Sequence, residues 1–144
     1  MSNLEAEITA GEVQVGSTRA GIQVNLSEEV LFDEGSAQLD DVGREVLFRL
    51  AQQLLEITDD IEVQGHTDDQ PISPELAGRY PSNWELAGAR AGEVVRLLEG
   101  VGIESDRLTA RSFGETRPIA SNETEDGRRR NRRIELRILR GADG

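Results

Sequence analysis

The sequence contains no cysteine and no lysine, few aromatic residues and no long apolar run. Without cysteine there is no disulfide framework, no thiolate nucleophile and no zinc knuckle. Because aromatic residues make up only 3% of the chain, leucine, valine, isoleucine and alanine must build the core. No stretch approaches the roughly 20 apolar residues that a membrane-spanning helix needs. At 144 residues, the chain suits one domain with an aliphatic core.

The charge balance is strongly acidic, and every basic side chain is arginine. The 28 acidic residues outnumber the 16 basic ones, for a formal net charge of −12 at pH 7. A field of this sign repels phosphate, which argues against general binding of DNA, RNA or anionic lipid. The lack of lysine has two explanations, a GC-rich genome, which we favour, and adaptation to high salt. Composition alone does not separate them.

The ends of the chain are expected to lie outside the folded domain. Residues 1–10 are polar and without pattern, which predicts a linker, and residues 141–144 are expected to be a tail. The predicted domain covers residues 11–140. The N-terminus has neither a basic region nor an apolar region, so it is not a signal peptide. We expect the chain to be a soluble fragment of a longer polypeptide.

Apolar residues at helical spacing predict two long helices. The first covers about residues 39–55, with acidic residues near its N-terminal end. The second begins at the capping box Ser82-Asn83-Trp84-Glu85, directly after a proline, and is expected to stop at Gly100 or Gly102. A shorter helix is expected around residues 123–130.

Alternating apolar and polar residues predict the strands of one sheet. They indicate a strand pair, or one strand with a lead-in, over residues 13–26 and single strands over residues 61–66, 108–112 and 134–138. Residues 69–81 hold three of the four prolines and are expected to form an ordered surface loop. The order of elements predicts an α/β (α+β) sandwich, with helices packed on one face of a mixed β-sheet.

One acid and one base stand out as a candidate pair. Asp68 follows a predicted strand, so it is expected on a loop at the sheet's edge, and Arg90 is expected beside the apolar stripe of the second helix. If they lie at the opening of one pocket, Asp68 and Arg90 would bind a ligand that carries both an ammonium and a carboxylate. From the residues alone, Asp68 could equally cap its loop, and Arg90 could be solvated or paired with Glu85 or Glu93.

Five ordered segments resemble the peptidoglycan-binding domain shared by OmpA-like outer-membrane proteins, peptidoglycan-associated lipoproteins and MotB-type flagellar stator subunits. Together they cover Leu31–Leu39, Gly65–Asp69, Ser82–Ala91, Arg111–Pro118 and Asn122–Glu135. Five segments in order are far more specific than one short motif. The resemblance implies an OmpA-C-like fold and a non-catalytic module, without cofactor, that anchors its parent protein to the cell wall.

The resemblance also implies a ligand, the meso-diaminopimelate residue of the peptidoglycan stem peptide. Asp68 matches the acid that binds the ammonium, and Arg90 matches the arginine that binds the carboxylate. Asn83 and Arg132 match further polar contacts, although Asn83 could also cap its helix. The remaining residues of the predicted binding set are Gly35, where a plain turn is the alternative, Thr67, Asp69, which could instead shape its loop, and Asn131.

Within this family, residues 65–72 and 80–86 look like the MotB-type stator branch. That branch implies a periplasmic domain whose parent is anchored in the inner membrane, and a weak homodimer. A MotA-type channel partner would be reached only through a membrane segment that this chain lacks. The alternative is a general envelope tether of OmpA or lipoprotein type. A peptidoglycan-cleaving enzyme is disfavoured because the carboxylates show no catalytic spacing.

Three further features are interpreted as structural. His66, the only histidine, is expected to fix a strand end through a hydrogen bond, because a metal site needs several converging ligands. Trp84 is expected to anchor the core. The arginines of residues 128–133 form the only basic cluster, and the overall acidity argues against a nucleic-acid patch. Arg128, Arg129 and Arg130 are expected to balance the nearby acids Glu123, Glu125 and Asp126.

Overall fold

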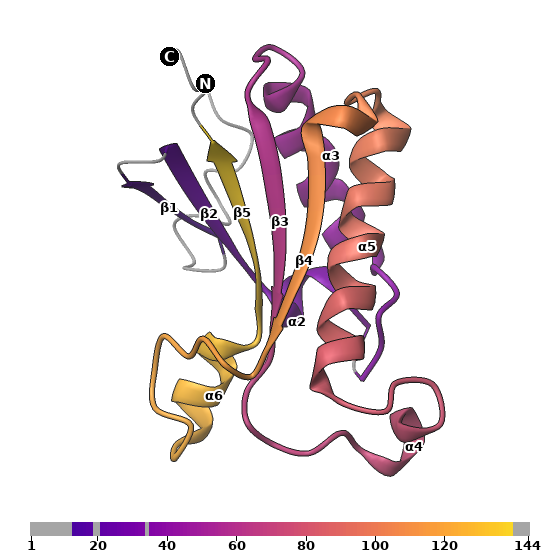
Figure 1. Ribbon diagram of the computed structural model, residues 1–144, viewed down its shortest axis with the longest axis vertical. Coiled ribbons are helices and arrows are strands. Elements are labelled where there is room, and N and C mark those ends of the chain that lie inside the picture. The colour runs from indigo at the N-terminus through magenta and orange to yellow at the C-terminus, as the bar shows by residue number, and fades with distance from the viewer. Residues whose placement is uncertain (1–12, 19–20, 34, 140–144) are drawn as a thin grey trace.

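The computed structural model of the protein describes residues 13–18, 21–33 and 35–139. Five strands in this part of the chain form one mixed sheet with the order β1-β2-β5-β3-β4. β3 and β4 run parallel, and all other neighbouring strands are antiparallel. The last strand therefore lies between two earlier ones (Figure 1). The strands are β1 (Val13–Thr18), β2 (Gly21–Ser27), β3 (Asp60–His66), β4 (Leu108–Gly114) and β5 (Arg133–Leu139).

Two long helices, α3 (Asp41–Leu54) and α5 (Asn83–Val101), pack on one face of this sheet. Apolar residues of β3 and β5, such as Val63 and Leu136, form the core with the buried stripes of the helices. The other face of β3 and β5 carries polar residues. Short helical segments connect the layers: α2 (Glu28–Leu31), α4 (Pro74–Ala77), the 3-10 turn η1 (Ser105–Arg107) and α6 (Glu125–Asn131).

The contact between α5 and β3 is close enough to require glycine at residue 65. A Cβ atom added at Gly65 would lie 2.1 Å from the backbone oxygen of Ala87 in α5. Ser82 caps the start of α5 by accepting a hydrogen bond from the Trp84 amide, and Gly102 follows its end with a φ of 123°. The first turns of α5 are thereby fixed against the end of β3, where the candidate pair lies.

The predicted sandwich, its five strands and its two long helices are confirmed. The sequence did not predict α2, α4 or η1, because three or four residues are too few to show a helical period. Trp84 is a correction, since its side chain is 49% exposed instead of anchoring the core. It lies against Gly114 of the edge strand β4 and not on the buried stripe of α5.

The predicted linker, residues 1–10, and the predicted tail, residues 141–144, lie outside the described residues. Within the described part of the chain, no helix has the length and apolar character to cross a membrane.

Candidate functional site

A pocket of about 190 Å³ lies where the loop after β3 meets the start of α5 and the segment after α2. Six of the predicted site residues line it: Gly35, Thr67, Asp68, Asn83, Arg90 and Arg132. They come from four separate stretches of the chain, which the fold brings together. Apolar side chains from the loop and α5, including Ile72, Leu76 and Leu86, complete the wall.

Asp68 is held in place by its own loop. The Thr67 amide donates to the carbonyl of Gly114 at 2.9 Å, and the Thr67 hydroxyl donates to the carbonyl of Asp68 at 2.8 Å. The Gln70 amide donates to Asp68 Oδ1 at 3.0 Å, while Oδ2 pairs with Arg132 at 2.7 Å. Asp68 is only 7% exposed. The predicted position after the strand is confirmed, and the carboxylate is both buried and fixed.

Arg90 lies deeper than its helical position predicted. It is 5% exposed and pairs with Glu28, so it is neither solvated nor paired with Glu85 or Glu93, which were the alternatives to a binding role. Its Nε donates to the carbonyl of Ser36 at 2.9 Å, and the guanidinium lies over the ring of Phe32, 5.2 Å from the centroid. The prediction that Arg90 lies beside the buried stripe of α5 was wrong. The residue is buried because α2 and the segment after it, with Glu28, Phe32 and Ser36, cover it.

Glu28 and Arg132 extend the pair into a line of alternating charges. One oxygen of Glu28 pairs with Arg90, and the other lies 3.3 Å from Arg132 Nε. Arg132 then reaches Asp68 at 2.7 Å and Glu125 at 2.8 Å. Burial by itself would lower the pKa of Arg132, but these hydrogen bonds and the charge of Glu28 raise it above its usual value. Arg132 is therefore a permanent cation beside Asp68.

Glu28 was not selected from the sequence. It lies on a short helix after β2, and no motif or spacing marks it as a functional residue. Its contacts with Arg90, 62 positions away, and with Arg132, still farther along the chain, are long-range, so only the folded structure could find it.

Asn83 anchors the loop to α5. Its amide donates to the carbonyl of Gln70 at 2.9 Å and to a carboxylate oxygen of Glu115 at 3.0 Å. Ser82 is the residue that caps the helix, and Asn83 lines the pocket while its amide nitrogen holds the loop. Gly35 has a φ of 63°, a left-handed conformation that favours glycine, in the turn that closes the pocket.

Two predicted residues do not line this pocket. Asp69 is exposed and accepts a hydrogen bond from the side chain of Gln70. Asn131 is completely buried, and its side chain bonds the backbone of Ile119 and Ala120. These bonds hold the loop before α6 against the end of that helix, and Asn131 thereby helps to position the neighbouring Arg132.

The pocket can hold opposite charges next to each other, because Asp68 and Arg90 enter it from different walls. Their present partners, Arg132 and Glu28, carry the charges that a zwitterionic ligand would bring. His66 lies elsewhere, with its Nε2 3.0 Å from the side-chain oxygen of Gln64, as expected for a residue that fixes the strand. Among the described residues, no group of three or more His, Asp or Glu side chains could hold a metal ion.

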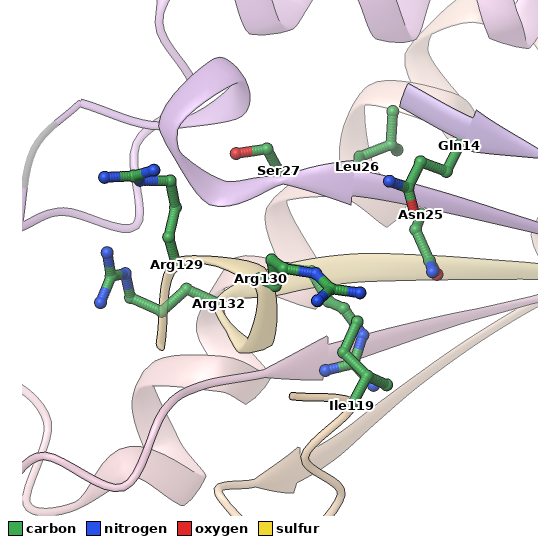
Figure 2. A pocket seen from close by; sticks show the side chains of 9 residues that line it. Gln14, Asn25, Leu26, Ser27, Ile119, Arg129, Arg130 and Arg132 are labelled. Atoms are coloured by element: carbon green, nitrogen blue, oxygen red, sulfur yellow. The ribbon is translucent and has the colours of Figure 1, made fainter. Parts of the chain in front are cut away.

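A second, smaller pocket of about 110 Å³ adjoins the site, and four arginines of the predicted basic cluster line it: Arg129, Arg130, Arg132 and Arg133. Figure 2 shows that Arg129 and Arg132 extend to one side, whereas Arg130 extends toward Ile119. Arg128 pairs with Glu125 at 3.2 Å, and Arg129 pairs with Asp126 at 3.4 Å, as expected. Arg130 differs from the prediction, since it has no ion pair with any described residue.

Known proteins are similar to this chain in sequence and in architecture. A model of the OmpA family matches residues 31–132. Motility protein B of Bacillus subtilis (strain 168) is 34% identical over 137 residues, which cover 91% of this chain and 50% of that protein. The chain spans about half the length of the curated relatives it matches.

Solved structures show the same fold. The cell wall anchor of the T6SS from Pseudomonas aeruginosa is 36% identical, with a TM-score of 0.87 over 96% of this chain and 94% of that chain. The periplasmic domain of Helicobacter pylori MotB is 28% identical, with a TM-score of 0.81 over 90% of this chain and 82% of that chain.

Proposed function

Since the chain belongs to the OmpA family, we propose that it is a non-catalytic module that binds peptidoglycan and anchors its parent protein to the cell wall. Its ligand would be meso-diaminopimelate of the stem peptide, and its compartment the periplasm. The similarity to a structure described as a cell wall anchor supports the anchoring role.

The observation that carries this proposal is the pair of buried, opposite charges in one pocket. Asp68 and Arg90 are 7% and 5% exposed, and backbone hydrogen bonds hold each of them. The free end of meso-diaminopimelate has an ammonium and a carboxylate on one carbon. Asp68 would take the ammonium and Arg90 the carboxylate, each through charge-assisted hydrogen bonds. Asn83, Arg132, Thr67 and the turn at Gly35 would contribute further polar contacts.

Binding requires the ligand to replace two internal partners. Its ammonium competes with Arg132 for Asp68, and its carboxylate competes with Glu28 for Arg90. Both exchanges conserve the number of ion pairs in the pocket. Arg132 keeps Glu125 as a partner when Asp68 is taken, so no buried charge would be left alone.

The first test is sedimentation with insoluble peptidoglycan. We expect Asp68→Ala and Arg90→Ala each to abolish co-sedimentation, because loss of one partner of a desolvated charge pair costs about 2–5 kcal/mol. Asp69→Ala is the matched control, since Asp69 is the exposed neighbour that does not line the pocket. Circular dichroism would establish that all three variants fold. If folded Asp68→Ala and Arg90→Ala proteins sediment like the control, the site assignment fails.

The second test concerns the identity of the stem-peptide residue. Lysine at this position offers the ammonium but lacks the carboxylate that Arg90 would bind. We expect calorimetry to give clearly weaker binding for a lysine-type stem peptide than for a diaminopimelate-type one. Equal affinities would contradict a role for Arg90 in ligand selection, while leaving wall binding itself open to the sedimentation test.

Two kinds of parent protein fit the comparisons. We favour a MotB-type stator subunit, with inner-membrane anchoring and a MotA-type partner supplied by other parts of the protein, because Motility protein B matches over 91% of this chain. The 36% identity to the T6SS cell wall anchor favours a different envelope machine with the same wall-binding domain. The sequence that flanks this domain in its gene would distinguish them: a stator requires a membrane helix preceded by a short cytoplasmic tail.

A further inference from the structure

The face of the sheet opposite α3 and α5 contains a groove of about 500 Å³ that the proposed peptidoglycan site does not use. Alternate residues of β3, β4 and β5 and the loop after β4 line it. Four of the lining residues are arginines, Arg111, Arg117, Arg133 and Arg137, and two are glutamates, Glu62 and Glu135. Four positive and two negative charges leave an excess of two positive charges, although the whole chain carries −12.

The ion pairs in the groove show where this excess lies. Glu135 forms ion pairs with two arginines, Arg137 at 2.7 Å and Arg133 at 3.4 Å. Glu62 pairs with Arg111 at 3.3 Å. The guanidinium of Arg117 has no carboxylate partner among the described residues. Its guanidinium carbon lies over the ring of Phe113, 4.4 Å from the centroid, and this cation–π contact holds the cation at the groove.

Two buried polar atoms in the residues that line the groove, Arg133 Nε and His66 Nδ1, also lack hydrogen-bond partners. Such groups are rare in folded proteins and call for an explanation. Because His66 Nε2 donates to the side-chain oxygen of Gln64, Nδ1 is an acceptor, and Arg133 Nε is the one of the two that can donate to an anion. Burial, followed by the charges of Arg133, Arg117 and Arg137, lowers the pKa of His66 to about 3. His66 is therefore neutral at pH 7, and the three arginine charges that add to the effect of burial also face the groove.

A further cation stands at one end of the groove. The small pocket of Figure 2 shares Ile119 and Arg133 with it, and Arg130 extends toward Ile119 there. Because Arg130 has no ion pair with any described residue, its charge adds to the local excess.

We propose that this groove is a second binding site, and that its ligand is a small phosphate group held mainly by Arg117 and Arg137. A carboxylate is satisfied by one guanidinium fork, whereas the oxygens of a phosphate point in several directions. Here the arginines come from different elements: Arg111 lies on β4, Arg117 on the loop after β4, and Arg137 on β5. The ligand is small because the acidic protein as a whole repels an extended polyanion, while the local excess acts within the groove.

The sole histidine provides a direct NMR probe, because its two imidazole C–H signals come from a single residue, and that residue lines the groove. Sodium phosphate would be titrated at pH 7 against a sodium chloride reference of equal ionic strength. We expect a saturable shift of the His66 signal with phosphate. A shift that is absent, or that only follows ionic strength, would overturn the proposal.

Two variants distinguish binding at this groove from a general effect of the protein's net charge. Arg117→Gln should weaken phosphate binding by roughly fivefold or more, because it removes a fixed pair of donors. Arg44→Gln removes the same charge from the exposed surface of α3 and should leave the affinity unchanged. Equal affinities in these two variants would show that only net charge matters and would refute the site. Arg117→Gln should still sediment with peptidoglycan, since Arg117 does not line the first pocket.

Two further ligands define the chemistry. Glycerol 3-phosphate binding more tightly than inorganic phosphate would identify a phosphate ester as the ligand, and the reverse order would identify the free ion; both support the proposal. Sodium acetate binding as tightly as phosphate would overturn it, because the groove would then be a general anion patch.

Discussion

Glu28 joins the two arginines of the first pocket, Arg90 and Arg132, through its two carboxylate oxygens. It occupies the side of Arg90 that the carboxylate of the proposed ligand would need. Glu28 is thus an internal competitor for the ligand, while the carbonyl of Ser36 and the ring of Phe32 keep Arg90 in place without it.

We therefore expect Glu28→Gln to strengthen binding of a diaminopimelate-type stem peptide. Removal of one like charge near the ligand carboxylate should contribute about 1 kcal/mol, or roughly fivefold in affinity. Glu29→Gln is the control, because Glu29 is the more exposed neighbour, pairs with Arg129 at 3.2 Å and has no ion pair with Arg90, although it lies 3.9 Å from Arg132. Calorimetry that finds weaker binding for Glu28→Gln would show that Glu28 positions Arg90 instead of competing for it.

Helix α5 and strand β3 carry the opposing charges of the pocket, so their separation sets its width. Arg90 and Asn83 lie on one face of α5, and Asp68 follows the end of β3. Gly65 allows the two elements to touch, because any larger residue would meet the backbone of Ala87. A backbone obstacle cannot rotate away as a side chain can, so the helix itself would have to move.

Gly65→Ala should lower the free energy of unfolding by about 1–3 kcal/mol, as overpacking of a core contact does. It should also weaken peptidoglycan binding, since α5 would shift Arg90 away from Asp68. Gly92→Ala is the matched control within α5: its Cβ meets no atom within 4 Å, and alanine is the better helix former. Urea midpoints measure the first effect. An unchanged midpoint for Gly65→Ala would mean that the contact is looser than the structure indicates.

The whole molecule is acidic and has two separate charged sites, the balanced pocket around Asp68 and Arg90 and the basic groove around Arg117. A net charge of −12 opposes the approach of a second copy. Exposed aromatic anchors are few, with Trp84 on α5 and Phe48 on α3.

From these charges we expect a weak homodimer that salt favours, with monomer dominant at low ionic strength and low concentration. Screening shortens the range of the repulsion to about 10 Å at 0.1 M salt, which permits contact. Sedimentation equilibrium across a salt series measures the association constant. A tight dimer at low salt would contradict this expectation, and so would an association that salt weakens.

Periodicity in the sequence determined the elements and their inward faces. The spacing of apolar residues is a local property, so α3, α5 and the five strands could be predicted, as could the position of Asp68 after β3. The resemblance of five segments to one family predicted which residues meet. Six of the eight predicted binding residues line one pocket.

Only the tertiary structure decided the partners of these residues. Arg90 pairs with a residue 62 positions away and Arg132 with one 64 positions away, and no local pattern records such contacts. The exposure of Trp84 depends on where the edge strand β4 lies, and the groove on the open face depends on the strand order. Spacing along the chain determines which face a residue occupies, whereas the charge it meets there is set by elements from elsewhere in the chain.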